Sequence, residues 1–232
     1  MISWIIAAYN EEKRLPQTLY KLSNEYGDQD FEIIVSDDGS RDKTYKIALA
    51  FSQAHNNVKV VTDRHKGRGA ALRNGFKATR GEVVVFSSAD IVIPRKYMAK
   101  LVKDLSNYDL IMLSKHVSGS IGLNESIIRK VLSLFFNFLI RILWQIPYRD
   151  TQGVKVWKAS ALKKIMPKAK TNGFLFDLEV VLYAHKLGLK ITEVPWTYTY
   201  TPGSKVRIRS ILQMVIELML LRINWQKTSF YA

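Results

Sequence analysis

The first ninety residues of the chain alternate between short apolar runs and longer stretches in which apolar residues recur at helical spacing. Strand-like runs at 2–8, 31–36, 58–62 and 82–87 are separated by helix-like stretches at 15–26, 42–55 and 69–78. Later elements are predicted as helices at 97–105, 127–146 and 174–187 and strands at 110–114 and 190–199. Because parallel neighbouring strands need a crossover connection, repeated strand–helix–strand units of this length form a mostly parallel sheet flanked by helices. The sequence therefore predicts an α/β protein with a Rossmann-like sheet.

The composition limits the function classes without choosing one. With 232 residues, 47% of them hydrophobic, the chain is long enough to bury one large core. Its 35 Lys and Arg against 20 Asp and Glu give a net charge of +15, which attracts nucleic acid, anionic lipid or phosphorylated ligands. No nucleic-acid-binding motif accompanies the charge, so specific nucleic-acid binding is not expected. The absence of cysteine rules out a disulfide framework and suits an intracellular protein.

Polar residues follow each of the first four predicted strands, at 9–11, 37–40, 63–69 and 88–90. Ligands of such sheets bind beyond the carboxyl ends of the strands, so these segments form the candidate site. Asp37 and Asp38 offer carboxylates that accept hydrogen bonds from a base imide or a ribose hydroxyl. The alternative interpretation of this pair is a tight turn with a helix N-cap.

Cationic and acidic residues follow the third and fourth predicted strands. Lys66-Gly67-Arg68-Gly69 joins glycines to cations at a predicted helix start, which suits a diphosphate; the alternative is a solvated basic loop. Asp90 ends a strand and offers an oxygen ligand for Mg²⁺ or Mn²⁺; the alternative is a cap for the helix near Pro94. The four histidines match no metal-ligand spacing, so surface or packing roles are expected for them.

Together these segments resemble the successive signatures of family 2 glycosyltransferases with the GT-A fold. The first half matches at Ala8-Tyr-Asn-Glu-Glu12, Val35-Ser-Asp-Asp-Gly-Ser-Arg-Asp-Lys-Thr44, Gly67-Arg-Gly-Ala-Ala71 and Ser88-Ala-Asp90. The second half is similar to dolichyl-phosphate glucosyltransferases and mannose synthases at Asp150-Thr-Gln-Gly-Val-Lys155, Phe176-Asp-Leu-Glu179, Glu193-Val-Pro-Trp-Thr197 and Gly203-Ser-Lys205. The segment Glu12-Lys-Arg-Leu-Pro16 favours the glucosyltransferase branch, and the resemblance covers residues 2–207.

The resemblance assigns roles to residues at matching positions. It implies a nucleotide site made by Ala8, Tyr9, Glu11, Asp37, Asp38, Arg68, Ser88 and Ala89. It implies that Asp90 ligates Mg²⁺ or Mn²⁺ and that the reaction is carried by Asp90, Asp150, Arg68 and Lys205. It places around the acceptor Asp150, Gln152, Glu179, Trp196, Ser204, Lys205 and Arg207.

The resemblance implies an inverting transfer of a hexose from a nucleotide sugar to a polyprenyl phosphate such as dolichyl phosphate, with glucose from UDP-glucose preferred. Because a phosphate monoester is already ionised at neutral pH, it attacks the anomeric carbon without a strong general base. Three alternatives stay open. They are mannose transfer from GDP-mannose, a GT-A transferase acting on a glycan or soluble acceptor, and a catalytically weakened nucleotide-sugar-binding protein.

The segment Ser88-Ala89-Asp90 departs from the family pattern, which has Asp-x-Asp at this point. Val92 likewise stands where the family has a metal-ligating side chain, so weak metal affinity is expected. If the chain were a weakened binding protein, Ser88→Asp would raise its activity steeply.

Two later segments, 127–147 and 208–232, combine apolar and basic residues. The first carries apolar residues at helical spacing beside basic ones, which is typical of a helix in the interface of an anionic bilayer. The alternative is a helix buried against the domain or an oligomer partner. Neither segment is a clean span of about 20 apolar residues. We therefore expect a GT-A catalytic domain at 1–207 and a C-terminal amphipathic helix and tail at 208–232. Attachment to the cytoplasmic face of a membrane is expected to be peripheral or monotopic, and a homo-oligomer remains open.

Overall fold

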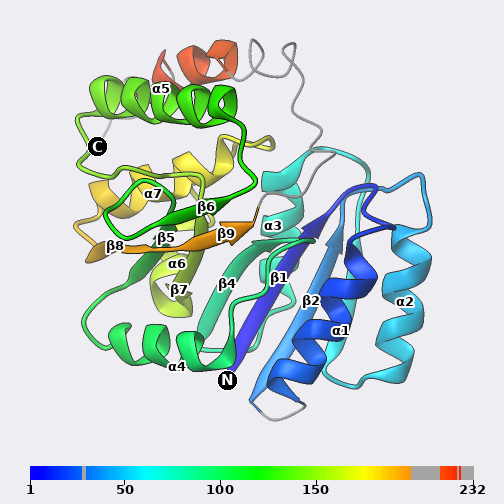
Figure 1. Cartoon of the computed structure of the whole chain (residues 1–232). Coiled ribbons are helices and arrows are strands. Elements are labelled where there is room, and N and C mark those ends of the chain that lie inside the picture. Colours follow the sequence, from blue (N-terminus) through cyan, green and yellow to red (C-terminus); the bar gives the residue numbers. More distant parts are fainter. Residues whose placement is uncertain (28–29, 200–214, 224, 226–232) are drawn as a thin grey trace.

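The computed structural model describes residues 1–27, 30–199, 215–223 and 225, and it contains a seven-stranded central sheet (Figure 1). The strands stand in the order β3-β2-β1-β4-β7-β5-β8. Their bounds are β1 (Ile2–Ala8), β2 (Phe31–Asp37), β3 (Val58–Thr62), β4 (Val83–Ser88), β5 (Leu110–Ser114), β7 (Val154–Lys158) and β8 (Ile191–Pro195). The pairs β3-β2, β2-β1, β1-β4 and β5-β8 are parallel. The predicted mostly parallel sheet is confirmed.

Strand β7 runs antiparallel to both of its neighbours, β4 and β5. It has no counterpart among the predicted elements, because Lys155 and Lys158 break its apolar pattern. Since β7 runs the other way, its first residue, Val154, pairs with Leu113 near the carboxyl end of β5. The turn that precedes β7 therefore reaches the same sheet edge as the loops that follow the parallel strands.

Helices cover both faces of the sheet. Their bounds are α1 (Leu15–Tyr26), α2 (Thr44–Ala54), α3 (Arg68–Lys77), α4 (Arg95–Asp104), α6 (Ala159–Ile165) and α7 (Phe176–Lys186). Side chains of α1, α2 and α4 pack with Trp4 and Ile6 of β1, whereas α3, α6 and α7 pack with Ile5 of the same strand. Burial on both faces explains why β1 is apolar along most of its length. Apart from α6, these helices lie within two residues of the predicted stretches.

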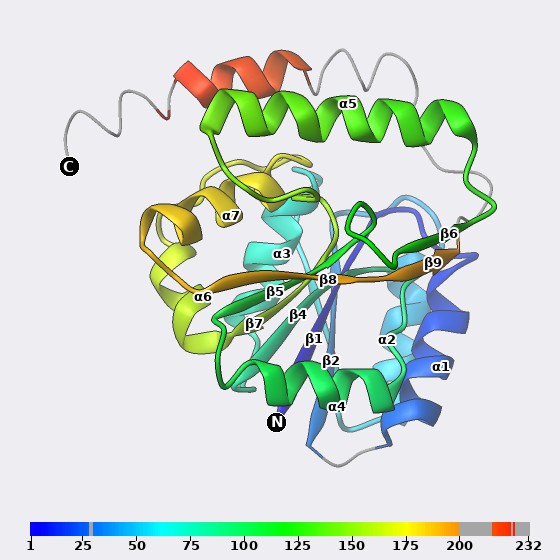
Figure 2. The same cartoon turned by 60° about the vertical axis from the view of Figure 1, so that its left-hand side comes forward.

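A long helix, α5 (Ile127–Trp144), lies side by side with the helix of residues 215–223 above the carboxyl edge of the sheet (Figures 1 and 2). Their inward sides share a small core with α7, in which Ile140 and Leu218 are fully buried. A short parallel pair, β6 (Ile121–Leu123) and β9 (Thr197–Thr199), forms a second sheet, in which β9 is separated from β8 by one residue. No helix among the described residues is long and apolar enough to cross a bilayer. The predicted domain boundary at residue 207 lies outside the described residues.

Candidate active site

Loops that follow β1, β2, β3 and β4 meet at the carboxyl edge of the sheet, as their order along the chain predicts. The strand register pairs Ala8 with Asp37 and Ala7 with Ser88, so the three strands end at nearly the same level. The backbone N–H of Asp38 donates to Ala8 O over 2.9 Å and ties the loop after β2 to the end of β1. Residues predicted for the nucleotide site are therefore brought together at one edge.

Asp38 holds the loop between β3 and α3 in place. Its buried carboxylate accepts the backbone N–H groups of Lys66 and Gly67, each at 2.9 Å, and lies 2.7 Å from His65 Nδ1. The His65 ring stacks on Tyr9, with the ring centroids 3.9 Å apart. His65, for which only a surface or packing role was expected, thus joins two of the predicted nucleotide residues.

Asp37 keeps one carboxylate oxygen available for a ligand. Its Oδ2 accepts hydrogen bonds from Ser40 N at 3.1 Å and Thr62 Oγ1 at 3.2 Å. Its buried Oδ1 has no hydrogen-bond partner in the described part of the protein. An unsatisfied buried acceptor costs about 1–3 kcal/mol, so such an oxygen calls for a ligand or a water. Asp37 therefore retains the capacity to accept an N–H or O–H from a nucleotide, whereas Asp38 is committed to its loop.

The glycines on either side of Arg68 make room for another loop. A Cβ at Gly67 would lie 2.6 Å from Asn172 O, and one at Gly69 would lie 2.5 Å from Thr171 O. The N–H of Gly69 also donates to Asn172 O at 2.7 Å, so the start of α3 is already capped. The two glycines, which the sequence suggested make room for a diphosphate, are thus also explained by close packing against residues 171–172. Of the predicted diphosphate segment, the side chain of Arg68 is the part that faces the site.

Arg68 reaches from the first turn of α3 to the end of β4. Its Nη1 donates to Ser87 O at 3.1 Å and to Ser88 Oγ at 3.2 Å. Its Nε donates to Asp177 Oδ2 at 2.8 Å, and Asp177 in turn pairs with the fully buried Lys155 at 2.8 Å. The guanidinium is therefore fixed beside Ser88, next to the predicted nucleotide and metal residues.

Asp90 lies just beyond β4, and its side chain is 32% exposed. Its Oδ2 is 3.4 Å from Nη1 of Arg14, and Arg14 makes a two-point ion pair with Glu11 at 2.6 and 2.7 Å. Among the described residues, no group of three or more metal-ligating side chains is found. Mg²⁺ is commonly held by about one or two carboxylates, with substrate phosphates and waters completing its shell. Asp90, as a part-exposed carboxylate at the predicted diphosphate position, fits that kind of site.

The turn before β7 carries Asp150, which was predicted on the acceptor side. Asp150 is buried and accepts the N–H groups of Lys115 at 2.9 Å and Gln152 at 3.1 Å, and its own N–H donates to Glu193 at 2.8 Å. Within the described residues, the buried atoms Thr151 Oγ1 and Gln152 Nε2 have no hydrogen-bond partner. The structure therefore places two unsatisfied polar groups beside Asp150, where the acceptor head group is predicted.

Other predicted site residues make contacts within the protein. The buried carboxylate of Glu179 accepts a backbone N–H at 2.7 Å, and Trp196 stacks on a tyrosine of α4 with ring centroids 5.9 Å apart. The carbonyl of Ala89 accepts a threonine hydroxyl of α1 at 2.6 Å. Their ligand-binding roles stay predictions. The described residues do not include Ser204, Lys205 and Arg207.

Three residues at this edge were not predicted as site residues: Asp177, Lys155 and His65. Asp177 lies in the motif segment 176–179 and His65 in the polar segment 63–69, so their location in these segments could have identified them as candidate site residues. Lys155 ends the motif segment 150–155, but its burial inside a strand could not be read from its neighbours.

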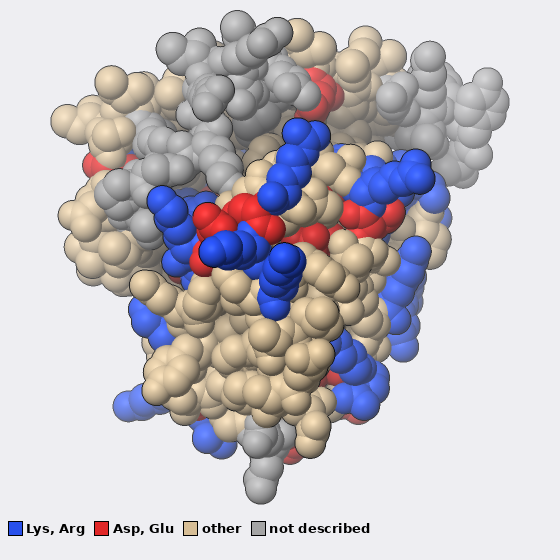
Figure 3. All heavy atoms as spheres, turned by 90° about the vertical axis from the view of Figure 1, so that its right-hand side faces the viewer, with Lys and Arg blue, Asp and Glu red and all other residues tan. Residues whose placement is uncertain are grey.

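Charge of both signs is mixed on the face that carries α1 and α2. Figure 3 shows acidic and basic side chains lying side by side in a band across the upper half of this face. The pairs Arg14–Glu11 and Lys66–Asp63, in the loops after β1 and β3, are ion pairs of this kind. Two of the cations near the site, Arg14 and Lys66, are therefore paired with acidic groups.

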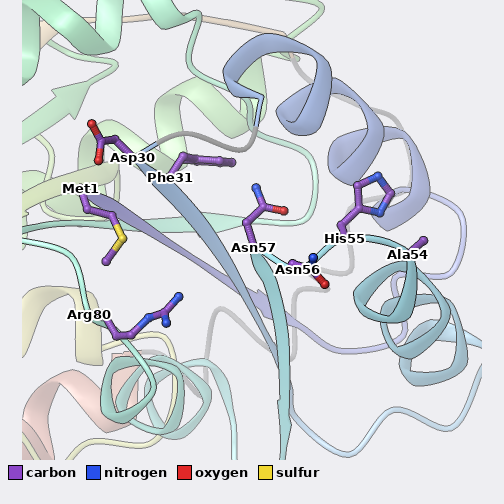
Figure 4. A pocket seen from close by; sticks show the side chains of 8 residues that line it. All are labelled: Met1, Asp30, Phe31, Ala54, His55, Asn56, Asn57 and Arg80. Atoms are coloured by element: carbon purple, nitrogen blue, oxygen red, sulfur yellow. The ribbon is translucent and has the colours of Figure 1, made fainter.

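A cavity of about 370 Å³ lies at the opposite, amino edge of the sheet. Figure 4 shows Met1 and Arg80 on one side of it and His55 and Asn57 on the other. None of the predicted site residues lines this cavity. It is therefore separate from the site to which the motifs point.

The family model described as Glycosyl transferase family 2 matches residues 3–166. This chain is a family 2 glycosyltransferase. The match spans the loops after β1 to β4 and the turn before β7, which are the segments that meet at the carboxyl edge. The resemblance seen in the sequence is confirmed, and the protein is an enzyme of glycosyl transfer.

Named relatives extend this similarity over nearly the whole chain. This chain is 32% identical over 235 residues to the dolichyl-phosphate beta-glucosyltransferase ALG5A of Trichomonas vaginalis. The alignment covers 96% of this chain and 73% of the relative. The chain is 32% identical over 246 residues to the dolichyl-phosphate beta-glucosyltransferase of Mus musculus, covering 97% and 75%. The similarity thus continues past the family-model match, which ends at residue 166, into segments that were predicted to bind the acceptor.

Solved structures share the architecture of this glycosyltransferase. Glucosyl-3-phosphoglycerate synthase from Mycobacterium tuberculosis, in complex with Mn²⁺, UDP and glucosyl-3-phosphoglycerate, gives a TM-score of 0.70 at 21% identity, covering 96% of this chain and 79% of that chain. S. aureus TarS in complex with UDP-GlcNAc gives a TM-score of 0.62 at 20% identity, covering 89% and 61%. At this identity the likeness concerns the fold, and the predicted GT-A fold is confirmed.

Proposed function

We propose that this glycosyltransferase transfers glucose from UDP-glucose to dolichyl phosphate or a similar polyprenyl phosphate, with inversion, while attached peripherally or monotopically to the cytoplasmic face of a membrane. The lipid acceptor is supported by the relatives, which are named dolichyl-phosphate beta-glucosyltransferases. The nucleotide donor and a divalent metal are supported by a structural neighbour bound to UDP and Mn²⁺.

The observation that carries the proposal is an apolar surface above the carboxyl edge, which we call the upper surface. It consists of side chains of α5 and residues 215–223 that are 39–81% exposed: Ile127, Ile128, Val131, Leu132, Leu134, Phe135, Phe138, Ile142, Ile216, Met219, Leu220 and Ile223. Lys130 and Arg141 are exposed on the same helix, and residues 127–149 include no Asp or Glu. Apolar and cationic groups together are typical of a helix that lies in an anionic membrane interface.

Hydrogen bonds tie α5 to the acceptor side of the site. Asn137 Oδ1 accepts the N–H of Thr151 at 3.2 Å, and His116 Nε2 lies 2.9 Å from Ser133 Oγ. The helix that carries most of the upper surface is therefore fixed to the turn that contains Asp150. This supports a lipid that stays in the membrane interface while its phosphate approaches that turn.

The carboxylates on the acceptor side suit a nucleophile that is already charged. Asp150 accepts two backbone N–H groups, Asp177 pairs with two cations, and Glu179 accepts one backbone N–H. A hydroxyl acceptor needs a carboxylate placed to remove its proton, whereas a phosphate monoester is largely ionised at neutral pH. This arrangement favours a lipid phosphate over a glycan hydroxyl.

The remaining site residues then act on the donor. Tyr9 and Asp37 would hold the base and ribose, and Arg68 would stabilise the negative charge that develops on the leaving diphosphate. Asp90 would hold Mg²⁺ or Mn²⁺, which supplies Lewis-acid stabilisation of the diphosphate when it is bound. Because the phosphate attacks from the side opposite the leaving group, a single displacement inverts the anomeric carbon.

The reaction is tested with the full chain, UDP-glucose and a short polyprenyl phosphate, with and without Mg²⁺ or Mn²⁺. We expect an acid-labile glucolipid in the organic phase that requires the metal. GDP-mannose is assayed in parallel, and a product from it alone would overturn the choice of donor. Glucose recovered only on a soluble acceptor would contradict the lipid assignment.

Membrane attachment is tested with a matched pair of aromatic substitutions. Phe135 of the upper surface is 56% exposed, and Tyr20 of α1 is 64% exposed away from it. Burying one aromatic side chain stabilises by about 1.5–3 kcal/mol, so Phe135→Asp should weaken co-sedimentation with phosphatidylserine-containing vesicles about 10-fold or more. Tyr20→Asp should leave it unchanged, and equal losses in the two variants would contradict the upper surface as the contact.

A further inference from the structure

A buried network of three charged residues joins the donor side of the site to the acceptor side. Asp177, the second residue of α7, accepts a hydrogen bond from Arg68 Nε on one oxygen and from Lys155 Nζ on the other, each at 2.8 Å. Lys155 Nζ also donates at 2.9 Å to the carbonyl of Gly153, in the turn that contains Asp150. One carboxylate therefore links α3, β7 and α7 at the carboxyl edge.

The network contains more positive charge than its own pairing requires. Two cations contact one carboxylate. Asp150 also attracts Lys155 electrostatically but forms no ion pair with either cation among the described residues. Burial by itself would raise the pKa of Asp177, but attraction to Lys155 and Arg68 holds that pKa below its ordinary value. Burial lowers the pKa of Lys155, against the opposite effect of Asp177. Buried ion pairs add little stability compared with apolar packing of the same volume. A stabilising role alone therefore does not explain three charges with a surplus cation.

The surplus charge is accessible at only one of the three side chains. The Arg68 side chain is 16% exposed, whereas those of Asp177 and Lys155 are 2% and 0% exposed. Nη1 of Arg68 is anchored to the end of β4, but Nη2 donates to no protein atom among the described residues. The guanidinium thus keeps N–H groups and a net charge for an anion that enters beside Ser88.

We infer that Asp177 is a positioning residue that holds Arg68 for the diphosphate of the donor, while Lys155 prevents Asp177 from cancelling the charge of Arg68. This inference rests on the nucleotide-sugar donor of the proposed function. With Nε bound to Asp177 and Nη1 bound to β4, the guanidinium plane is fixed before the ligand arrives, so less conformational entropy is lost on binding. Lys155 also extends the network to the acceptor turn, which places the donor and acceptor segments in one rigid frame.

The inference is tested by a double-mutant cycle on nucleotide binding, with UDP as the probe and isothermal titration calorimetry as the measurement. Asp177→Asn keeps the size of the side chain and removes its charge. We expect it to weaken UDP binding about 10-fold, because hydrogen bonds to charged groups have this order of effect. Arg68→Met should weaken UDP binding as much or more. In the Arg68→Met background, Asp177→Asn should have no further effect, since Asp177 acts through Arg68.

A merely structural role for Asp177 predicts the opposite result, namely an equal loss of UDP affinity in both backgrounds, and this would overturn the inference. Because Asp177→Asn leaves Lys155 buried without its partner, the same cycle is repeated in a Lys155→Met background, where no lone buried cation remains. Failure of the wild-type chain to bind UDP or GDP would overturn both proposals. Normal UDP binding without a lipid-linked product would count against the proposed function alone, and the cycle would still decide the role of Asp177.

Discussion

The two edges of the sheet each bury a carboxylate between two cations. At the carboxyl edge Asp177 is paired with Arg68 and Lys155, and at the amino edge Glu32 is paired with Lys59 at 3.2 Å and with an arginine at 3.1 Å. The cations differ in exposure, since those of Glu32 are 36% and 60% exposed and those of Asp177 are 0% and 16% exposed. The same pairing of charges therefore stands in two different environments.

The difference in cation exposure indicates that the two carboxylate–cation clusters have different roles. Glu32 also accepts the Ser3 hydroxyl and the N–H of Arg80, each at 2.6 Å, so its oxygens are filled by the protein and its cations are solvated. Around the carboxyl edge, Asp37 Oδ1 and Gln152 Nε2 have no partner among the described residues. The carboxylate of Glu32 is satisfied within the protein, whereas Asp37 and Gln152 at the opposite edge keep polar atoms for ligands.

The largest effect is expected at the carboxyl edge, from Asp90→Ala. Loss of the predicted metal ligand should lower turnover of UDP-glucose and polyprenyl phosphate by about 100-fold or more, in line with losses of groups that stabilise transition-state charge. Because Asp90 is part-exposed, the thermal unfolding midpoint should stay unchanged. Glu82→Ala, just before the other end of β4, is the matched control and should keep full turnover. Near-normal turnover of Asp90→Ala would remove Asp90 from the mechanism.

Glu32→Gln should give the reverse pattern at the amino edge. The substitution leaves buried hydrogen-bonding groups with a poorer acceptor, so the free energy of unfolding should fall by about 1–3 kcal/mol. UDP affinity and turnover per folded molecule should not change, because no predicted site residue lies at this edge. Urea unfolding followed by fluorescence, with an activity assay on the same samples, measures both quantities. A loss of turnover at unchanged stability would break the contrast between the edges.

The sequence predicts well which loops meet at the carboxyl edge on the proposed donor side, for a physical reason. In a parallel sheet buried on both faces, strands read as continuous apolar runs, and the residues after them collect at one edge. This local pattern is enough to bring Asp37, Arg68, Asp90 and their loops together without knowledge of any long-range contact.

The proposed acceptor side could be predicted only in part, because its arrangement depends on partners that are distant in the sequence. Lys155 is buried within β7 only because Asp177, 22 residues later, neutralises it, and Asp177 meets Arg68 across 109 residues. A lysine in a short apolar run otherwise indicates a surface segment, so β7 was missed. Likewise, Gly67 and Gly69 suggested room for a phosphate, and only the folded chain shows that Asn172 lies beside Gly67 and Thr171 beside Gly69.

Acid pH should lower the free energy of unfolding by protonating Glu32. Near neutral pH this effect should be smaller than that of Asp90→Ala on turnover or of Glu32→Gln on stability. Burial would raise the pKa of Glu32, but hydrogen bonds from Ser3, Arg80 and Lys59 hold it below its ordinary value of 4.5. A carboxylate with a lowered pKa stabilises the fold above its unfolded pKa, and this contribution is lost as the pH falls through the folded pKa. The free energy of unfolding should therefore decline below about pH 4.5, and the decline should be shallower in Glu32→Gln. Equal declines in the two proteins would contradict this origin.

The smallest effects are expected from removing one serine hydroxyl at each edge of the sheet. Ser88 Oγ accepts a hydrogen bond from Arg68 at 3.2 Å, and Ser3 Oγ donates to Glu32 at 2.6 Å. Because Ser87 O still anchors Arg68, Ser88→Ala removes one hydrogen bond and should weaken UDP binding by about 2- to 10-fold at unchanged stability. Ser3→Ala should instead lower stability and leave UDP binding intact. If Ser88 is only a defect in a weakened binding protein, Ser88→Ala should leave UDP affinity at the wild-type value. Calorimetry of UDP binding to Ser88→Ala and Ser3→Ala therefore decides whether the Ser88 hydroxyl helps to hold Arg68.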